Sequence, residues 1–221
     1  MQEIDLSRIK PRKVRDFISC QGLLSSRDFT KMRPTCFDPR RADDFRSHQE
    51  YYLIKASPDI VWDTYKTIHP AEAWCGHMIS FGLQYSATTG KVCYLDDEYH
   101  GMEVGVVVVL NLKLFWGLFN LAVAHQIMEI DEVNRTIKLC YMASGASEGS
   151  QWISLLETEE GYTGIYHETM YKSKSDFRDT KLYPRLHSRA VAEFHRNIRL
   201  KAESTASLQV KHPLVTPQVS G

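Results

Sequence analysis

Apolar and polar residues alternate over much of the middle of the chain, and this alternation predicts β-strands. Ile79, Phe81, Leu83 and Tyr85 alternate with small or polar residues, a period of two that is typical of a strand with one buried face. Similar patterns predict further strands over 50–56, 91–95, 102–112, 122–130, 136–142, 150–158 and 162–173. The polar segments 131–135 and 159–161 are typical of turns, so the last four strands should pair as two antiparallel hairpins.

Other segments have helical spacing. The segment 57–68 begins with Ser-Pro-Asp, residue types preferred at the start of a helix, and Pro70 ends it. A short helical piece is expected over 71–76. Near the end of the chain, residues 183–202 carry an apolar stripe at helical spacing, formed by Leu186, Ala190 or Val191, Phe194 and Ile198. The pattern therefore predicts one long amphipathic helix after the strands.

The two ends of the chain are less regular than its middle. Residues 1–48 are interpreted as an N-terminal extension, with a short helix within 11–24 that packs onto the main body through Phe17, Leu23 and Leu24. Residues 49–203 form the main domain. The segment 204–221 contains two prolines and small polar residues, so we expect it to be disordered.

Composition narrows the class of protein. Hydrophobic residues make up 43% of the 221 residues, enough for a sizeable core. The 27 basic and 27 acidic residues cancel, which argues against a nucleic-acid partner. The longest apolar run, 104–110, is far too short to span a bilayer, and the polar start of the chain lacks the pattern of a signal peptide. We therefore expect a cytoplasmic protein, and its oligomeric state is left open.

The five cysteines are scattered, and no pair has the CxxC spacing of a zinc or redox motif. This pattern predicts neither a disulfide framework nor a structural zinc site. Free, buried thiols in a reducing cytoplasm are expected instead.

The order of these elements, with one motif, points to a known fold. A strand is followed by two short helices, about six antiparallel strands and a long helix. The stretch Tyr52-Leu53-Ile54-Lys55-Ala56-Ser57-Pro58-Asp59-Ile60-Val61-Trp62 resembles the opening strand and helix of the START-like, Bet v 1-like superfamily, which includes polyketide cyclase-type proteins. The resemblance covers about residues 49–202. It implies an α+β helix-grip fold, in which a curved antiparallel sheet of about seven strands surrounds the C-terminal helix, with a hydrophobic cavity between them.

Strand alternation predicts which side chains face that cavity. Glu168 and Lys172 are costly to bury, so the opposite face of their strand, with His167, Thr169 and Tyr171, should point inward. The same test predicts outward positions for Lys138, Glu129 and His125. The inward positions on the other strands are then Ile137, Leu139, Tyr141, Ala124, Gln126, Met128, Ile130, Ile79, Phe81, Leu83 and Tyr85.

The expected interior therefore mixes apolar side chains with several polar groups, the usual composition of a small-molecule site. The alternative is a filled core in which the polar groups satisfy one another. On the first interpretation, the ligand-binding residues are Phe81, Leu83, Tyr85, Gln126, Met128, Leu139, Tyr141, Thr169, Leu186, Ala190 and Phe194.

His167 and Tyr171 are the candidate catalytic pair. They lie on one strand face, a histidine can transfer protons near neutral pH, and a tyrosine can donate to a developing enolate. No metal site is expected, because His187 and His195 are two helical turns apart, about 12 Å. No cofactor is expected either.

Three hypotheses follow. The first is a protein that binds a small hydrophobic or aromatic molecule. The second is an enzyme of the polyketide cyclase/aromatase or hydrolase type that acts on such a ligand by acid–base chemistry. The third is a structural or interaction domain with a closed core. Fold alone does not choose between them.

Overall fold

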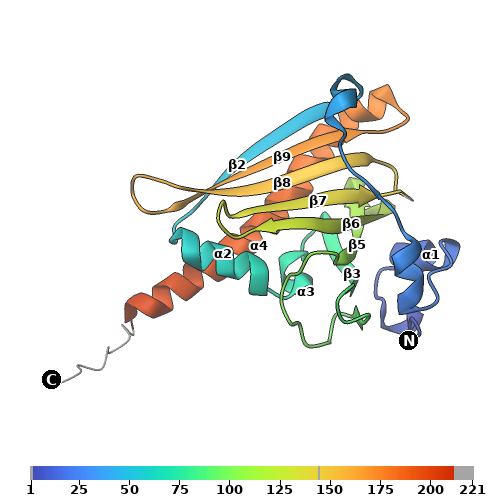
Figure 1. Ribbon diagram of the computed structural model, residues 1–221, viewed down its shortest axis with the longest axis horizontal. Coiled ribbons are helices and arrows are strands. Elements are labelled where there is room, and N and C mark those ends of the chain that lie inside the picture. Colours follow the sequence, from blue (N-terminus) through green and yellow to red (C-terminus); the bar gives the residue numbers. More distant parts are fainter. Residues whose placement is uncertain (1, 144, 212–221) are drawn as a thin grey trace.

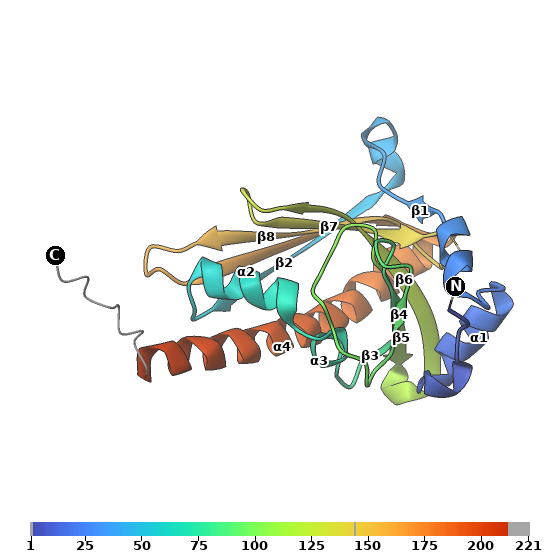
Figure 2. The same cartoon turned by 60° about the horizontal axis from the view of Figure 1, so that its bottom comes forward.

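The computed structural model describes residues 2–143 and 145–211, and its centre is one antiparallel sheet that curves around a long helix (Figures 1 and 2). The sheet order is β2-β9-β8-β7-β6-β5-β3-β4, and β1 pairs with β7. The strands are β1 (Pro34–Thr35), β2 (Arg46–Ile54), β3 (Ile79–Tyr85), β4 (Val92–Cys93), β5 (Val107–Leu114), β6 (Phe119–Asp131), β7 (Thr136–Met142), β8 (Glu148–Glu157) and β9 (Thr163–Lys172). The two predicted hairpins are present as β6–β7 and β8–β9.

The helices lie on both sides of this sheet. They are α1 (Arg12–Cys20), α2 (Pro58–Thr67), α3 (Pro70–Ala73) and α4 (Tyr183–Lys211), with a π-helical turn, η5 (Arg178–Leu182), before α4. Short 3-10 segments are η1 (Leu6–Arg8), η2 (Ser26–Lys31), η3 (Pro39–Asp44) and η4 (Phe115–Gly117). In Figure 2, α4 runs beneath the concave face of the sheet, while α1 lies beyond the opposite face.

The core is divided by the sheet into two layers. Between the sheet and the helices α2 and α4, Ile137, Ile153, Ile165 and Phe194 belong to one buried cluster. On the outer face, the N-terminal segment buries its own apolar residues against β3, β5 and β6. That second cluster contains Ile9, Val14, Ile18, Leu23 and Phe29. Leu23 is thus buried, whereas Leu24, expected to pack as well, is 65% exposed.

The C-terminal helix is longer than the sequence pattern predicts. It continues to Lys211, so the expectation of disorder is wrong for residues 204–211. The remaining residues of the expected tail, 212–221, lie outside the described part of the chain. The helix packs against the core at Ala202, which is fully buried, and at Ala206, whereas Leu208 is 60% exposed. The helix therefore extends past the packing that the sequence pattern detects.

Two β-bulges reverse the faces of their strands. The pairing of β3 with β5 skips Gly82, and the pairing of β6 with β7 skips Met128. One extra residue shifts the alternation by one, so side chains beyond it point to the opposite face. A Cβ atom at Gly82 would lie 2.7 Å from the carbonyl oxygen of Val109 and 2.7 Å from a methyl group of Val14. Glycine therefore permits this close approach of β3, β5 and α1.

Because of the bulges, several side chains point to the opposite face from the one predicted. Leu83 and Tyr85 pack on the outer face with the N-terminal segment, not inward. Ala124 does the same, and His125, predicted to face outward, is on the cavity side. Gln126 is half-buried and donates to the carbonyl of Gly105, away from the cavity. Ile130 is inward as predicted. The inward and outward assignment for this strand, which used Glu129 as the outward residue, is therefore right for the residues after Met128 and reversed for the residues before it.

The prediction about the cysteines was also wrong. Cys36 and Cys140 form a disulfide across 104 positions of sequence, with Cα atoms 4.9 Å apart. The remaining thiols are not buried either, since Cys20 and Cys75 are exposed and Cys93 is half-buried. Cys140 lies on the outer face of β7, so the bond ties the N-terminal segment covalently to the sheet.

Candidate functional site

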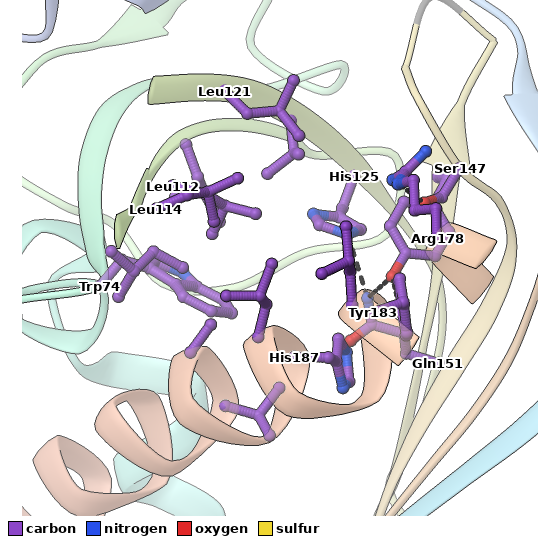
Figure 3. Close-up of a pocket in the computed structure, with 18 of the residues that line it drawn as sticks. Trp74, Leu112, Leu114, Leu121, His125, Ser147, Gln151, Arg178, Tyr183 and His187 are labelled. Atoms are coloured by element: carbon purple, nitrogen blue, oxygen red, sulfur yellow. Dashed lines mark hydrogen bonds between the residues drawn. The ribbon is translucent and has the colours of Figure 1, made fainter. Parts of the chain in front are cut away.

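A cavity of about 220 Å³ lies between α4 and the inner faces of β3, β5, β6 and β7 (Figure 3). The register explains why these strands supply it: Ile79 lies opposite Leu112, and Leu112 lies opposite Leu121, so three strands present apolar side chains side by side. From the helix, Leu186 and Ala190 face the same space. For scale, an engineered apolar cavity of about 150 Å³ holds benzene.

One end of the cavity is apolar. Leu112, Leu114 and Trp74 gather there in Figure 3. The indole of Trp74 is held in place because it stacks on Phe194, with ring centroids 3.9 Å apart. This end offers aliphatic and aromatic contact but no charge.

The opposite end is polar. Figure 3 places His125, Gln151, Tyr183, Ser147 and Arg178 around it. The guanidinium of Arg178 donates to the hydroxyl of Ser147 at 2.7 Å and to the carbonyl of Ala146. The hydroxyls of Tyr141 and Tyr183 are hydrogen-bonded to each other. The cavity is thus apolar at the end near Trp74 and polar at the end near Arg178.

Behind the polar end, buried side chains form a continuous hydrogen-bonded array. Nε2 of Gln151 donates to Tyr141 at 3.1 Å and to Nε2 of His125 at 3.0 Å. The oxygen of the same amide, Oε1, is 3.0 Å from Nε2 of His167. Nδ1 of His167 is 2.7 Å from Nε2 of His195, whose Nδ1 is 2.7 Å from the hydroxyl of Tyr65. The array therefore links β6, β7, β8 and β9 to α4 and α2.

The orientation of the Gln151 amide determines which ring nitrogen of each histidine carries the hydrogen. Since Oε1 of Gln151 can only accept, His167 carries its proton on Nε2 and accepts from His195 at Nδ1. Burial lowers the pKa of His167 to about 3 and the pKa of His125 to about 4, so both rings are neutral at pH 7. Burial also raises the pKa of Tyr141 to about 12. The polar end is therefore uncharged apart from Arg178.

The candidate catalytic pair does not reach the cavity. His167 points inward, but both ring nitrogens are engaged in the array, and the hydroxyl of Tyr171 donates to the carbonyl of Asp179 at 2.7 Å. The ring of Tyr171 stacks on that of Tyr183, with centroids 3.6 Å apart. Both residues support the cavity wall from behind instead of bordering it.

The expected ligand-binding residues fall into three groups. Tyr141, Leu186 and Ala190 border the cavity. Leu139 and Phe194 border a separate space of about 40 Å³ beneath α2 and α3. The others lie elsewhere: Phe81 packs against Ala190 without bordering the cavity, Thr169 is fully buried behind it, Met128 is the bulge residue, and Leu83, Tyr85 and Gln126 are on the outer side.

The sequence pattern missed most of the polar end. His125 was placed on the wrong face, and the strand that contains Gln151 was given no face assignment. Arg178 was not among the predicted site residues. The only available signal was its position next to the start of the helix that closes the cavity.

The described chain also bears on metals and membranes. Within 2–143 and 145–211, no group of three or more His, Cys, Asp or Glu side chains is placed to hold a metal ion. No helix in these ranges is long and apolar enough to cross a lipid bilayer.

Comparisons with known proteins give a match in structure only. No protein-family model matches the chain, and no curated protein matches its sequence. A solved structure of norcoclaurine synthase from Thalictrum flavum superimposes with a TM-score of 0.54 at 15% identity, over 73% of this chain and 96% of that one. KanY superimposes with a TM-score of 0.52 at 14% identity, over 72% of this chain and 98% of that one. This chain has the Bet v 1-like helix-grip fold.

A second structure of the norcoclaurine synthase, solved with dopamine and hydroxybenzaldehyde, has a TM-score of 0.52 at 15% identity, over 80% of this chain and 95% of that one. The helix-grip fold accounts for the predicted order of strands and helices. At this level of identity the likeness concerns the fold alone.

Proposed function

We propose that this protein binds a small hydrophobic or aromatic molecule in the cavity between the sheet and α4. The observation that carries the proposal is the cavity itself, because it combines an apolar end at Trp74 with converging polar groups at Arg178 and Tyr183. Small-molecule sites in proteins usually have this composition. A closed core would instead fill about 220 Å³ with side chains, since protein interiors are close-packed.

The structural neighbour adds support of a general kind. Norcoclaurine synthase has been solved with dopamine and hydroxybenzaldehyde, which are single-ring aromatic compounds. A ligand of one or two rings is also the size that the cavity volume favours here.

An enzyme of the cyclase or hydrolase type is the alternative, and the cavity gives it less support. Acid–base chemistry needs a group that can exchange a proton with the ligand. His125 and His187 border the cavity, but Nε2 of His125 accepts from Gln151, and burial lowers the pKa of His125 to about 4 and that of His187 well below its usual value, so both are weak bases. The binding hypothesis requires no free base and is therefore preferred.

Binding can be tested with 2-naphthamide, a neutral two-ring probe, by titration calorimetry. Leu121 borders the cavity, so Leu121→Trp should fill the space and reduce affinity at least tenfold while the protein stays folded. Leu118→Trp is the matched control, because Leu118 is 79% exposed. Equal affinity of both variants and of the wild-type protein would place the ligand elsewhere and contradict the proposal.

A further inference from the structure

The polar end of the cavity offers more hydrogen-bond donors than acceptors. Arg178 uses two of its nitrogens on Ala146 and Ser147, and guanidinium groups have further N–H donors in a planar fork. Nε2 of Gln151 donates to the hydroxyl oxygen of Tyr141, and either hydroxyl can be the donor in the bond between Tyr141 and Tyr183. In both cases one hydroxyl hydrogen of this pair has no acceptor among the hydrogen bonds of the described residues.

Most of the acceptors at this end are already in use, and Nε2 of His187 is the ring nitrogen there that has no partner among the described residues. The Oε1 atom of Gln151 bonds to His167, and Nε2 of His125 bonds to the amide of Gln151. No aspartate or glutamate of the described residues borders the cavity. A ligand that reaches this end therefore meets N–H and O–H groups and finds few free lone pairs.

The charge at this end of the cavity also favours a ligand group that accepts hydrogen bonds. In the described part of the chain, Arg178 has no carboxylate partner within ion-pair distance, although other arginines such as Arg46 and Arg135 do. The positive charge of Arg178 also opposes the rise in the pKa of both Tyr141 and Tyr183, which places it near their oxygens. A negative group on a ligand would supply the missing counter-charge.

We propose that the ligand carries a carboxylate, which Arg178 and the hydroxyl of Tyr183 bind while one or two rings fill the apolar end. A carboxylate matches the planar fork of a guanidinium, and such charge-assisted bonds are about twice as strong as neutral ones. This inference rests on the proposed function, because it names the ligand class for the same cavity. It makes the cavity selective for small aromatic acids over their neutral analogues.

The test compares 2-naphthoate with 2-naphthamide, which have the same ring system and similar shape but differ in charge. The wild-type protein should bind the acid about tenfold more tightly than the amide, and this preference should shrink as the salt concentration rises. Arg178→Gln should weaken binding of the acid much more than binding of the amide, and so reduce the preference to about twofold or less. Arg185→Gln is the matched control, since Arg185 is an exposed residue of α4 that does not border the cavity.

Each result bears on a different step. Equal binding of acid and amide by the wild-type protein would overturn the carboxylate inference and leave the binding function standing. Binding of neither probe would overturn both. Arg178 also holds the loop before β8, so Arg178→Lys serves as a second variant. A lysine keeps the positive charge but lacks the planar guanidinium, so this variant should retain part of the preference for the acid. An unchanged ratio in both folded variants would remove Arg178 from the site.

Discussion

Oε1 of Gln151 lies 3.0 Å from Nε2 of His167, and this contact joins the cavity wall to the interface between β9 and α4. The same amide holds Tyr141 and His125 on its other side. One glutamine side chain therefore satisfies three buried polar residues, and it fixes which nitrogen of each histidine carries the proton.

Replacing this glutamine should destabilise the protein strongly. Gln151→Leu leaves Nε2 of His125 and the Nε2–H of His167 unsatisfied and removes one of the hydrogen bonds of Tyr141, and an unsatisfied buried polar group costs about 1–3 kcal/mol. We expect the free energy of unfolding, measured with urea, to fall by roughly 3 kcal/mol or more. Gln49→Leu is the control, because Gln49 is exposed and bonds only to Glu168. A loss in Gln151→Leu no larger than in the control would show that the array adds little stability.

Stability should fall in mildly acidic solution. Burial lowers the pKa of His125 to about 4, that of His167 to about 3, and those of His187 and His195 well below the usual 6.5. Below pH 6.5 the unfolded chain takes up protons at these positions and the folded chain does not, so acid favours unfolding. The histidine contribution is complete above pH 6.5 and is lost as pH falls toward about 4.

The slope in this window should be about 1.4 kcal/mol per pH unit for each histidine that stays neutral in the folded state. Urea unfolding at pH 7, 6 and 5 measures it. Carboxylates with lowered pKa, such as Asp28 at about 2, act mainly below this range and do not explain a loss between pH 6 and 5. A free energy of unfolding that is flat from pH 7 to 5 would contradict the buried, neutral histidines.

Breaking the disulfide should also destabilise the fold. The bond closes a loop across 104 positions, and the chain-entropy model assigns such a loop about 4.7 kcal/mol. Cys36→Ser should therefore unfold at lower urea concentration, while Cys75→Ser, at an exposed free thiol, should not. Thiol titration of the denatured protein gives an independent check: three groups should react before reduction and five after it. Five reactive groups before reduction would show that the bond does not form.

Gly82 should not tolerate a side chain. In Gly82→Val the new Cβ atom would meet the backbone oxygen of Val109, which cannot move without disturbing the pairing of β3 and β5. We expect a loss of about 1–3 kcal/mol in unfolding free energy, and faster proteolysis of the segment around α1. Thr88→Val, in an exposed turn, is the control. A fully stable Gly82→Val protein would mean that the bulge does not need a glycine.

The order of elements could be predicted from the sequence because it depends on local patterns. The hairpins are marked by polar turns, and the strand that became β9 carries charged residues on one side only, so His167, Thr169 and Tyr171 were correctly turned inward. The start of α2 at Pro58 follows from the residue types preferred there. These features need no knowledge of distant partners.

The failures have a common physical origin. The outer face of β3, β5 and β6 is covered by the N-terminal segment, so both faces are apolar and the alternation no longer shows which side meets water. A single inserted residue, Gly82 or Met128, then reverses the inward and outward assignment of its strand, and the pattern of apolar and polar residues does not reveal it. The Cys36–Cys140 bond was missed for a similar reason, since it depends on the pairing of β1 with β7.

Strand β7 carries Cys140 on one side and Tyr141 on the other, so the covalent tie and the cavity share adjacent residues of one strand. If the oxidised and reduced forms differ in affinity for a ligand, thermodynamic reciprocity requires an equal effect in reverse. A ligand that binds the oxidised form tenfold more tightly makes the disulfide tenfold harder to reduce. Ligand binding and the redox state of the two cysteines would then be coupled through the adjacent residues Cys140 and Tyr141.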